Sequence, residues 1–250
     1  MLNKVSRFFS VLHFIWASVI FLITMILVLP FILLSTLLLR GKSAQDTAFV
    51  FIRIWAWLFS TLSLFHCRIR NKALSSSEQA FIYVANHSSF LDAVMLVRAL
   101  PQSFKPLGKV EMAKAPIFGM IYRKVVVMID RSCKESRDKC VHILKEEVSS
   151  GQSILIFPEG TMNRSERPLT EFYDGAFRIA IDTQTPLAPV VLVNARKLLP
   201  RTQPLFRIKP GTVTAVFAEP VAVEGMTMED VPKLKKKVYD QMEALLIAHS

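Results

Sequence analysis

The sequence predicts an α/β protein, with a mixed, largely parallel sheet flanked by helices and an N-terminal membrane-embedded helix pair. Three observations support this fold class. The first 66 residues are strongly apolar, strand and helix patterns alternate along the rest of the chain, and polar residues directly follow three apolar strands. Such alternation is typical of a parallel sheet, because each crossover between parallel strands needs a helix. We therefore expect a membrane-anchoring helical segment, residues 1–66, and one α/β domain, residues 67–250.

An apolar run near the N-terminus is long enough to cross a bilayer. No charged residue occurs from Val11 to Leu39, a run of about 29 residues against the ~20 that span the hydrocarbon core. A second apolar segment, from about Thr47 to His66, contains two tryptophans and the lone Arg53, which fits the membrane interface better than the bilayer centre. Two topologies stay open: both segments cross the bilayer, or the pair dips into one leaflet with Pro30 supplying a bend.

The net charge narrows the classes of partner. The 250 residues carry a formal net charge of +11, and a basic surface fits nucleic acid, anionic lipid or phosphorylated substrates. However, the sequence has no zinc-finger spacing, basic low-complexity tail or aromatic RNA-binding signature. With a membrane anchor present, anionic lipids and anionic substrates explain the charge better, so we expect no nucleic-acid partner.

Cysteine, histidine and glycine usage gives no sign of a metal or a nucleotide cofactor. The three cysteines and five histidines lack metal-ligand spacing, and free cysteines suit the reducing cytoplasmic side of a membrane. The eight glycines form no glycine-rich phosphate loop. We therefore expect neither a metal nor a cofactor.

The α/β domain alternates short apolar strands with helices. The predicted strands cover residues 81–86, 125–129, 153–157 and 187–193, and the predicted helices cover 91–100, 134–149 and 176–183. Two later strands, near 205–208 and 213–217, are expected at an edge of the sheet. A final helix over about 228–248 shows apolar residues at helical spacing.

A histidine and a carboxylate stand five residues apart where a buried strand turns into a helix. Ser89 suits the N-cap of this helix, and Asp92 completes a pattern like a capping box. In this arrangement His87 can accept a proton from a hydroxyl group, while Asp92 fixes its tautomer and stabilises the resulting cation. A histidine that only caps its own helix would show the same local pattern.

Polar residues also follow two other predicted strands. Glu159, Gly160 and Thr161 come after the strand 153–157, with Arg164 close behind, and Arg131 comes two residues after the strand 125–129. Open α/β sheets bind ligands at the carboxyl ends of their strands. A single arginine at a strand end is most often a surface charge, but three polar strand ends in one small domain favour a binding site.

Four sequence blocks resemble, in order, those of the HxxxxD glycerophospholipid acyltransferase family. The blocks are His87–Asp92, Ile129–Arg131, Phe157–Thr161 and Ala188–Val191. Within the family, the chain is most similar to the 1-acyl-sn-glycerol-3-phosphate acyltransferases, also called lysophosphatidic acid acyltransferases. One HxxxxD is a weak pattern, whereas four ordered blocks over roughly residues 81–194 form a strong one.

This resemblance implies an O-acyltransferase of phospholipid biosynthesis. It would transfer a fatty acyl group from an acyl thioester, either acyl-CoA or acyl carrier protein, to the sn-2 hydroxyl of 1-acyl-glycerol 3-phosphate, forming phosphatidic acid. Residues 67–250 would be the catalytic domain, on the cytoplasmic side of a membrane (the inner membrane in a bacterium) and in contact with membrane lipids. The implied general base is His87, held by Asp92. Acceptor phosphate would be bound by Lys109, Arg131 and Arg164, and the glycerol site would be lined by Glu159, Gly160 and Thr161.

Two departures from the family pattern concern the acceptor. The third block usually continues with arginine directly after the threonine, but here Met162 and Asn163 precede Arg164. The family often has lysine before a Gly-Ala pair, where this chain has Asp174. Glycerol 3-phosphate, another lysolipid or an aminolipid therefore remain alternative acceptors, and water would make the protein a thioester hydrolase. A non-enzymatic membrane lipid-binding protein is the more distant alternative.

Overall fold

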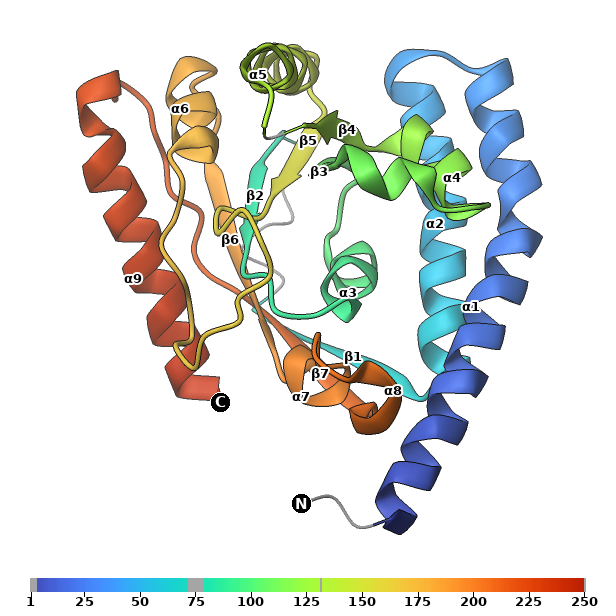
Figure 1. Ribbon diagram of the computed structural model, residues 1–250. Coiled ribbons are helices and arrows are strands. Elements are labelled where there is room, and N and C mark those ends of the chain that lie inside the picture. Colours follow the sequence, from blue (N-terminus) through green and yellow to red (C-terminus); the bar gives the residue numbers. More distant parts are fainter. Residues whose placement is uncertain (1–3, 72–78, 131, 250) are drawn as a thin grey trace.

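A mixed sheet forms the centre of the molecule, whose computed structural model describes residues 4–71, 79–130 and 132–249 (Figure 1). Within these residues the sheet has seven strands: β1 (Phe65–Arg70), β2 (Ile82–Ala85), β3 (Phe104–Lys109), β4 (Val127–Ile129), β5 (Ser153–Ile156), β6 (Leu187–Val193) and β7 (Gly211–Phe217). Their spatial order is β1-β7-β6-β2-β5-β3-β4. From β6 to β4 all neighbours are parallel, whereas β7 is antiparallel to β6 and parallel to β1. The predicted mixed, largely parallel sheet is thus confirmed.

Helices cover both faces of this sheet (Figure 1). On one side lie α5 (Lys134–Ser149), α6 (Gly175–Asp182) and α9 (Val231–His249). The other side carries α1 (Lys4–Leu38), α2 (Gly41–Leu62), α3 (Leu91–Ala99) and α4 (Phe118–Val125). Two short helices, α7 (Ala195–Leu198) and α8 (Pro204–Arg207), connect β6 to β7.

The sheet separates two apolar cores, and the side chains of β2 alternate between them. Tyr83 and Ala85 pack into the core shared with α1–α4, whereas Ile82 and Val84 pack into the core shared with α5, α6 and α9. Side chains of a strand point alternately to opposite faces. A strand covered by helices on both sides is therefore apolar throughout, as β2 is.

Helix α1 packs along α2 through one narrow stripe. Its buried residues recur every three or four positions, as at Ala17, Ile20, Thr24 and Val28, the spacing of one helix face. Near the other end of the pair, the indole Nε1 of Trp16 donates to the carbonyl of Leu62 at 2.8 Å. This contact satisfies a carbonyl in the last turn of α2 that has no partner within the helix.

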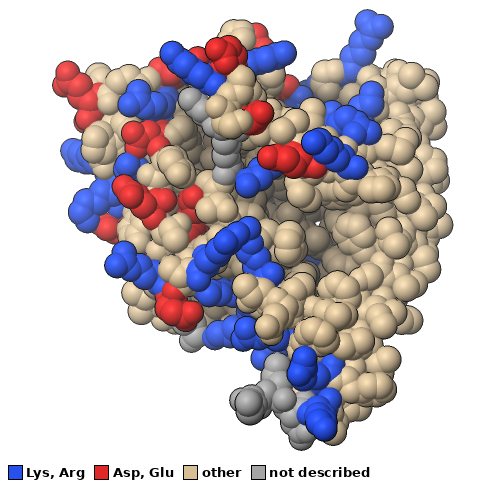
Figure 2. Space-filling model, viewed as in Figure 1, with Lys and Arg blue, Asp and Glu red and all other residues tan. Residues whose placement is uncertain are grey.

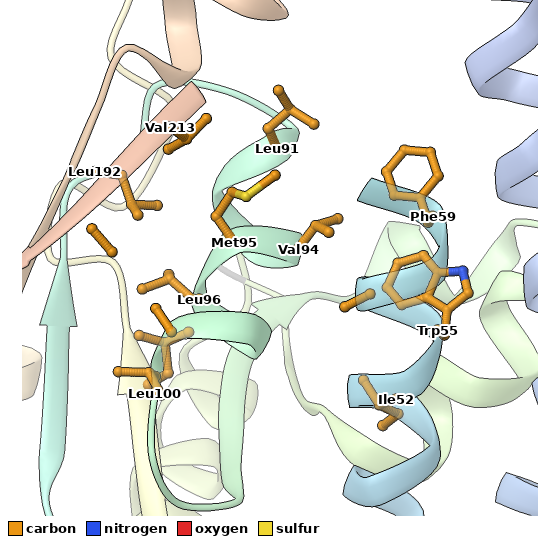
Figure 3. Packing of buried hydrophobic residues seen from close by; sticks show 14 of the residues in the cluster. Ile52, Trp55, Phe59, Leu91, Val94, Met95, Leu96, Leu100, Leu192 and Val213 are labelled. Carbon is orange, nitrogen blue, oxygen red and sulfur yellow. The ribbon is translucent and has the colours of Figure 1, made fainter. Parts of the chain in front are cut away.

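Helix α3 is held between the sheet and α2 (Figure 3). Trp55 and Phe59 of α2 lie on the side of Val94, whereas Met95 of α3 lies on the side of Leu192 of β6. Arg53 of α2 donates hydrogen bonds to the carbonyls of Leu100 (2.6 Å), Pro101 (2.6 Å) and Gln102 (3.2 Å), at the end of α3. Helix α2 is therefore held against the domain both by apolar packing and by the hydrogen bonds of Arg53.

The connection from the helix pair to the sheet is very short. Only Ser63 and Leu64 separate α2 from β1, and the carbonyl of Leu64 accepts a hydrogen bond from the N–H of Gly211 at the start of β7. The boundary expected between residues 66 and 67 thus falls inside β1. The division of the chain into two domains stays a prediction.

By length and composition, α1 can cross a membrane. Most of its large apolar side chains are exposed, including Phe9, Ile23, Leu27 and Phe31. A continuous apolar surface of this extent is unusual on a soluble monomer and is typical of a surface that contacts lipid or another protein.

Several elements differ from the sequence prediction. The segment 205–208, expected as a strand, lies almost wholly in α8, because Pro204 at its start has the backbone angle of a first helical turn. The predicted strand 125–129 begins only at Val127, because α4 extends to Val125. Strands β1 and β3 and helix α4 were not predicted. The predicted helix 134–149 and strand 187–193 match α5 and β6 residue for residue.

Candidate active site

The site lies at the carboxyl ends of the adjacent parallel strands β2 and β5. Val84 pairs with Ile156, so the chain leaves both strands at the same edge of the sheet. His87 follows β2 by two residues, and Glu159 follows β5 by three. The fold therefore brings together two polar segments that are 72 residues apart in the sequence.

His87 and Asp92 are in direct contact, as their spacing predicted. The ring Nδ1 of His87 lies 2.9 Å from Oδ2 of Asp92. The side chain of Asp92 is fully buried, whereas that of His87 is 19% exposed. The pair thus has its carboxylate inside the protein and part of its imidazole at the surface.

One oxygen of Asp92 organises the whole turn. Besides the imidazole, Oδ2 accepts the backbone N–H of Ser88 at 2.6 Å and that of Ser89 at 2.7 Å. Both backbone groups are donors, and an ionised carboxylate can only accept hydrogen bonds. We infer that His87 carries its proton on Nδ1, which leaves Nε2 as the acceptor.

The helix start differs in detail from the expected capping box. Asp92 does reach back to the N–H of Ser89, but the hydroxyl of Ser89 accepts from the N–H of Leu91 at 3.1 Å and donates to the carbonyl of Leu199 at 2.7 Å. Phe90, in a helical conformation, occupies the N-cap position. The predicted N-cap, Ser89, therefore lies one residue before the observed N-cap. The hydroxyl of Ser89 also holds the segment after α7.

The ring of His87 is contacted on its face by Phe157 as well as on its edge by Asp92. It stacks on Phe157, with ring centroids 4.1 Å apart and an angle of 19° between the planes. Phe157 directly follows β5, so the neighbouring strand limits the rotation of the imidazole. An imidazole restrained in this way loses little freedom when it receives a proton.

Glu159 connects the loops after β2 and β5. Its Oε1 accepts the backbone N–H of His87 at 2.8 Å, and its Oε2 accepts the N–H (2.9 Å) and hydroxyl (2.8 Å) of Thr170. The residue is only 3% exposed. Burial raises the pKa of the Glu159 carboxyl above its ordinary value, and the hydrogen bonds from His87 and Thr170 oppose this rise. Both oxygens of this carboxylate accept hydrogen bonds from within the protein, which suits a residue that positions His87.

Two asparagines complete the turn. The side-chain amide of Asn86 donates to the carbonyl of Leu192 (3.1 Å) and accepts from its N–H (2.7 Å), continuing the hydrogen bonding between β2 and β6. The N–H of Asn163 donates to the carbonyl of His87 at 2.7 Å. The buried side chain of Asn163 also folds its own loop, because Oδ1 accepts from the N–H of Ser165.

The other predicted site residues that the structure describes differ in exposure. Gly160 has a positive φ of 69° and is half-buried, and the side chains of Thr161 and Arg164 are exposed. Lys109 is the exposed last residue of β3, on the far side of β5 from β2. Arg131 lies outside the described residues. The roles of all these residues, and of His87 and Asp92, stay predictions.

The surface beside the site is hollowed. Figure 2 shows this hollow between α3 and α4, with mostly uncharged residues around it, and basic side chains gathered over the loop after β5 and over α7 and α8. In the described part of the chain, no group of three His, Cys, Asp or Glu side chains is placed to hold a metal ion.

Sequence reasoning gave no role to Phe157, which begins the third block, or to Asn86, which directly precedes His87, and it did not find Arg196 or Arg201 as parts of this region. The guanidinium of Arg196 hydrogen-bonds the carbonyl of Ser165, and that of Arg201 donates to the carbonyl of Met162 at 3.3 Å. Asn86 could have been noticed as an amide directly after a strand. The two arginines gave no local signal, because their partners are more than thirty residues away.

Comparisons with known proteins agree with this architecture. A model of the acyltransferase family matches residues 66–193, slightly more than half of the chain. The chain belongs to the acyltransferase family. The matched region contains β2 to β6 and therefore His87, Asp92 and Glu159.

Several curated relatives are similar to the chain. The chloroplastic 1-acyl-sn-glycerol-3-phosphate acyltransferase BAT2 of Brassica napus is 34% identical over 149 residues, covering 59% of this chain and 42% of that protein. The mouse 1-acyl-sn-glycerol-3-phosphate acyltransferase alpha is 30% identical over 169 residues, covering 66% of this chain and 58% of that protein. The chain thus spans about half the length of the first curated relatives it matches.

One solved structure is similar over almost the whole chain. The acyltransferase PlsC of Thermotoga maritima superimposes with a TM-score of 0.79, covering 99% of this chain and 97% of that one at 21% identity. The likeness establishes a common fold for this member of the acyltransferase family, including the N-terminal helix pair.

Proposed function

We propose that the protein transfers a fatty acyl group from an acyl thioester to the sn-2 hydroxyl of 1-acyl-glycerol 3-phosphate, with His87 as general base. The observation that carries this proposal is the His87–Asp92 pair, whose carboxylate is buried while the imidazole is partly exposed. The names of the two curated relatives described above, both 1-acyl-sn-glycerol-3-phosphate acyltransferases, support the acceptor.

The proposed reaction needs one base and no covalent enzyme intermediate. Nε2 of His87 takes the proton of the sn-2 hydroxyl as its oxygen bonds to the thioester carbonyl carbon. The carbonyl π electrons move onto the oxygen, and the positive imidazolium is stabilised by Asp92. When the carbonyl re-forms, the carbon–sulfur bond breaks, and the leaving thiolate takes the proton from His87. The products are phosphatidic acid and the free thiol of coenzyme A or of acyl carrier protein.

The acceptor phosphate would be bound by cations around the strand ends. We assign this role to Lys109, Arg131 and Arg164, because arginine and lysine form charge-assisted hydrogen bonds with phosphate. Gly160 and Thr161 would line the glycerol site, next to the peptide groups that hold His87. Glu159, also expected at the glycerol site, would act mainly by positioning His87, because both of its oxygens already accept internal hydrogen bonds.

The protein would work at a membrane surface. The exposed apolar face of α1 supports insertion into lipid, and the acceptor and product are themselves lipids. We place the catalytic domain on the cytoplasmic side, where both acyl carriers occur. An enzyme seated at the interface meets its acceptor without transferring the acyl chain into water, which would cost about 0.8 kcal/mol for each CH₂ group.

The decisive experiment is an assay of the purified full-length protein in detergent with a labelled acyl donor. Both carriers are offered, with 1-acyl-glycerol 3-phosphate, glycerol 3-phosphate, another lysophospholipid or an aminolipid as acceptor. Labelled phosphatidic acid is expected, whereas labelled free fatty acid would indicate a hydrolase. The His87→Ala variant should lose about 10²–10⁴-fold in rate.

Two results would overturn the proposal. Unchanged turnover of His87→Ala, in protein whose unfolding temperature matches the parent, would exclude His87 as the base. The absence of any acyl transfer with all acceptors and both carriers would instead favour the non-enzymatic lipid-binding alternative.

A further inference from the structure

The peptide unit between Met162 and Asn163 is held from both of its sides. Its N–H donates to the carbonyl of His87 at 2.7 Å, and its C=O accepts from Nη1 of Arg201 at 3.3 Å. The N–H and C=O of one peptide unit are parts of a single rigid plane. The guanidinium of Arg201 is therefore no more than about 9 Å from the backbone carbonyl of His87.

The main chain next to Arg201 also lies against the active-site turn. Pro200 forms a bridge with Ser89, and the carbonyl of Leu199 accepts the hydroxyl of Ser89 at 2.7 Å. Arg201 follows directly. Its backbone is thus fixed by the His87–Asp92 turn, and its side chain is fixed by the loop after β5.

Arg201 has spare hydrogen-bonding capacity at this place. A guanidinium offers five N–H donors, and among the described residues that of Arg201 donates one hydrogen bond, to the carbonyl of Met162. In the described part of the chain, no carboxylate lies within ion-pair distance of Arg201. Arg196, by contrast, lies 3.7 Å from a carboxylate oxygen of Glu166 and hydrogen-bonds two carbonyls of its loop.

The surroundings of Arg201 favour an anion. Basic side chains gather over this part of the surface (Figure 2), and Arg164 and Arg167 are exposed on the same loop that Arg201 contacts. A half-buried guanidinium is weakly hydrated and matches two phosphate oxygens with two parallel N–H groups. The phosphate of the acceptor is esterified to the carbon next to the one that carries the reacting hydroxyl, so its site must lie close to the His87 ring.

We propose that Arg201 is an additional binding residue for the phosphate of the acceptor. This inference rests on the proposed function and deepens it, because it adds a residue from beyond β6 to the site between β2 and β5. Arg201 supplies a cation beside Met162. Met162 itself is uncharged and stands directly after Thr161, where the third block usually has an arginine. The guanidinium keeps its contact with the Met162 carbonyl while its other N–H groups bind the phosphate.

The test separates phosphate binding from a purely supporting role. Arg201→Gln retains an N–H donor for the Met162 carbonyl but removes the charge. Arg201→Lys retains the charge but loses the paired N–H donors of the guanidinium. Arg207→Gln removes an exposed arginine of α8 and serves as the matched control. Each full-length variant is assayed in detergent with varied 1-acyl-glycerol 3-phosphate and varied donor. Inorganic phosphate serves as a competitive inhibitor against the acceptor.

We expect Arg201→Gln to raise the acceptor KM by between about tenfold and a hundredfold, since hydrogen bonds to charged groups are worth that much. The phosphate inhibition constant should rise by a similar factor, with kcat and the donor KM within about twofold of the parent. Arg201→Lys should recover part of the loss, and Arg207→Gln should match the parent.

An acceptor KM and a phosphate inhibition constant that both stay at parent values in Arg201→Gln would refute phosphate binding by Arg201. A fall in kcat with an unchanged acceptor KM would also refute it and would leave Arg201 as a support for the loop. Either outcome would leave the proposed function intact, because the parent enzyme would still form phosphatidic acid. An inactive parent would instead refute the proposed function.

Discussion

At the scale of single residues, the three hydrogen bonds on Oδ2 of Asp92 separate two contributions of this side chain. Its geometry holds the turn, and in the proposed reaction its charge would stabilise the protonated imidazole. An asparagine can keep the geometry, because its amide oxygen can accept the same three donors. Its amide nitrogen would replace Oδ1, which makes no hydrogen bond to a described residue, so no existing hydrogen bond is displaced.

We therefore predict that Asp92→Asn keeps the turn but loses about 10²-fold in kcat. Asp92→Ala should be both inactive and less stable, by about 1–3 kcal/mol for each backbone N–H left unpaired at Ser88 and Ser89. Steady-state kinetics and thermal unfolding in detergent measure the two effects. Equal stability of the alanine and asparagine variants would show that Asp92 does not hold the turn.

The buried carboxyl of Glu159 should make stability depend on pH. Burial raises its pKa in the folded protein above the value in the unfolded chain. The folded state then holds a proton that the unfolded state has released, so stability falls as the pH rises from the ordinary glutamate pKa through the raised value. Glutamine at this position cannot ionise and should remove that slope.

We predict that the stability advantage of the parent over Glu159→Gln shrinks as the pH rises across this window. The measurement is the unfolding temperature of both proteins at intervals between about pH 4 and 7, near the ordinary carboxyl range. The glutamine variant should also be less stable at every pH. Its amide N–H₂ group would replace one carboxylate oxygen, so that an N–H group would point at the N–H of His87 or at that of Thr170. A stability advantage of the parent that grows with pH would contradict the raised pKa.

Sequence alone predicts the residues of the site whose partners are local. His87 and Asp92 are five residues apart, so their pattern is visible before any fold is known. The contact of Glu159 with the N–H of His87 needed the parallel register of β2 and β5. The contacts of Arg201 needed the whole path of the chain from β6 through α7, which no local pattern encodes.

At the scale of elements, Arg53 fastens α2 to the end of α3. It binds three successive carbonyls and lies over the ring of Phe49, with its guanidinium carbon 5.0 Å from the ring centroid. We predict that Arg53→Ala loses about 1.5–3 kcal/mol, since hydrogen bonds to charged groups contribute about that much. A lower unfolding temperature, by several degrees, should report this loss.

The matched control is Arg40→Ala. Arg40 is exposed and stands just before α2, so its removal should change the unfolding temperature by less than a degree or two. Arg53→Lys should be intermediate, because one ammonium cannot match the spread of the guanidinium donors. If Arg53→Ala were as stable as Arg40→Ala, the packing of Ile52, Trp55 and Phe59 alone would hold α2 in place.

Strong periodic patterns predicted their elements well, and mixed ones did not. Helix α5 and strand β6 match their predicted bounds, because one has a clear amphipathic period and the other is continuously apolar. Strand β3 was missed, because its sequence FKPLGK contains two lysines, a proline and a glycine, all of which disfavour a strand. Helix α4 is only eight residues long and was not predicted, because Pro116 stands just before it and Gly119 lies in its first turn, and both residue types disfavour a helix.

At the scale of the whole molecule, the exposed face of α1 should decide where the protein resides. We predict that Ile23→Lys, in the middle of this face, weakens membrane binding strongly, because a lysine at the centre of a helix in hydrocarbon costs about 3 kcal/mol. Leu38→Lys is the matched control at the last residue of the helix, where the long side chain can reach the interface. Both side chains are exposed in the structure.

Flotation of each variant with anionic vesicles after a high-salt wash measures this difference. Ile23→Lys should leave the vesicle fraction in larger part than Leu38→Lys. Equal retention of the two variants would show that the apolar face of α1 does not enter lipid, and would favour its burial against another protein.

Because only two residues separate α2 from β1, the sheet has almost no freedom to move relative to the helix pair. A domain on a long tether can search the space above a bilayer, but here the edge strand of the sheet continues almost directly from the helix pair. If α1 enters lipid as proposed, the depth of the helix pair would therefore set the height of the His87 ring above the membrane. An enzyme built in this way has a fixed reach, and it can serve only those molecules that present their reactive group at that level.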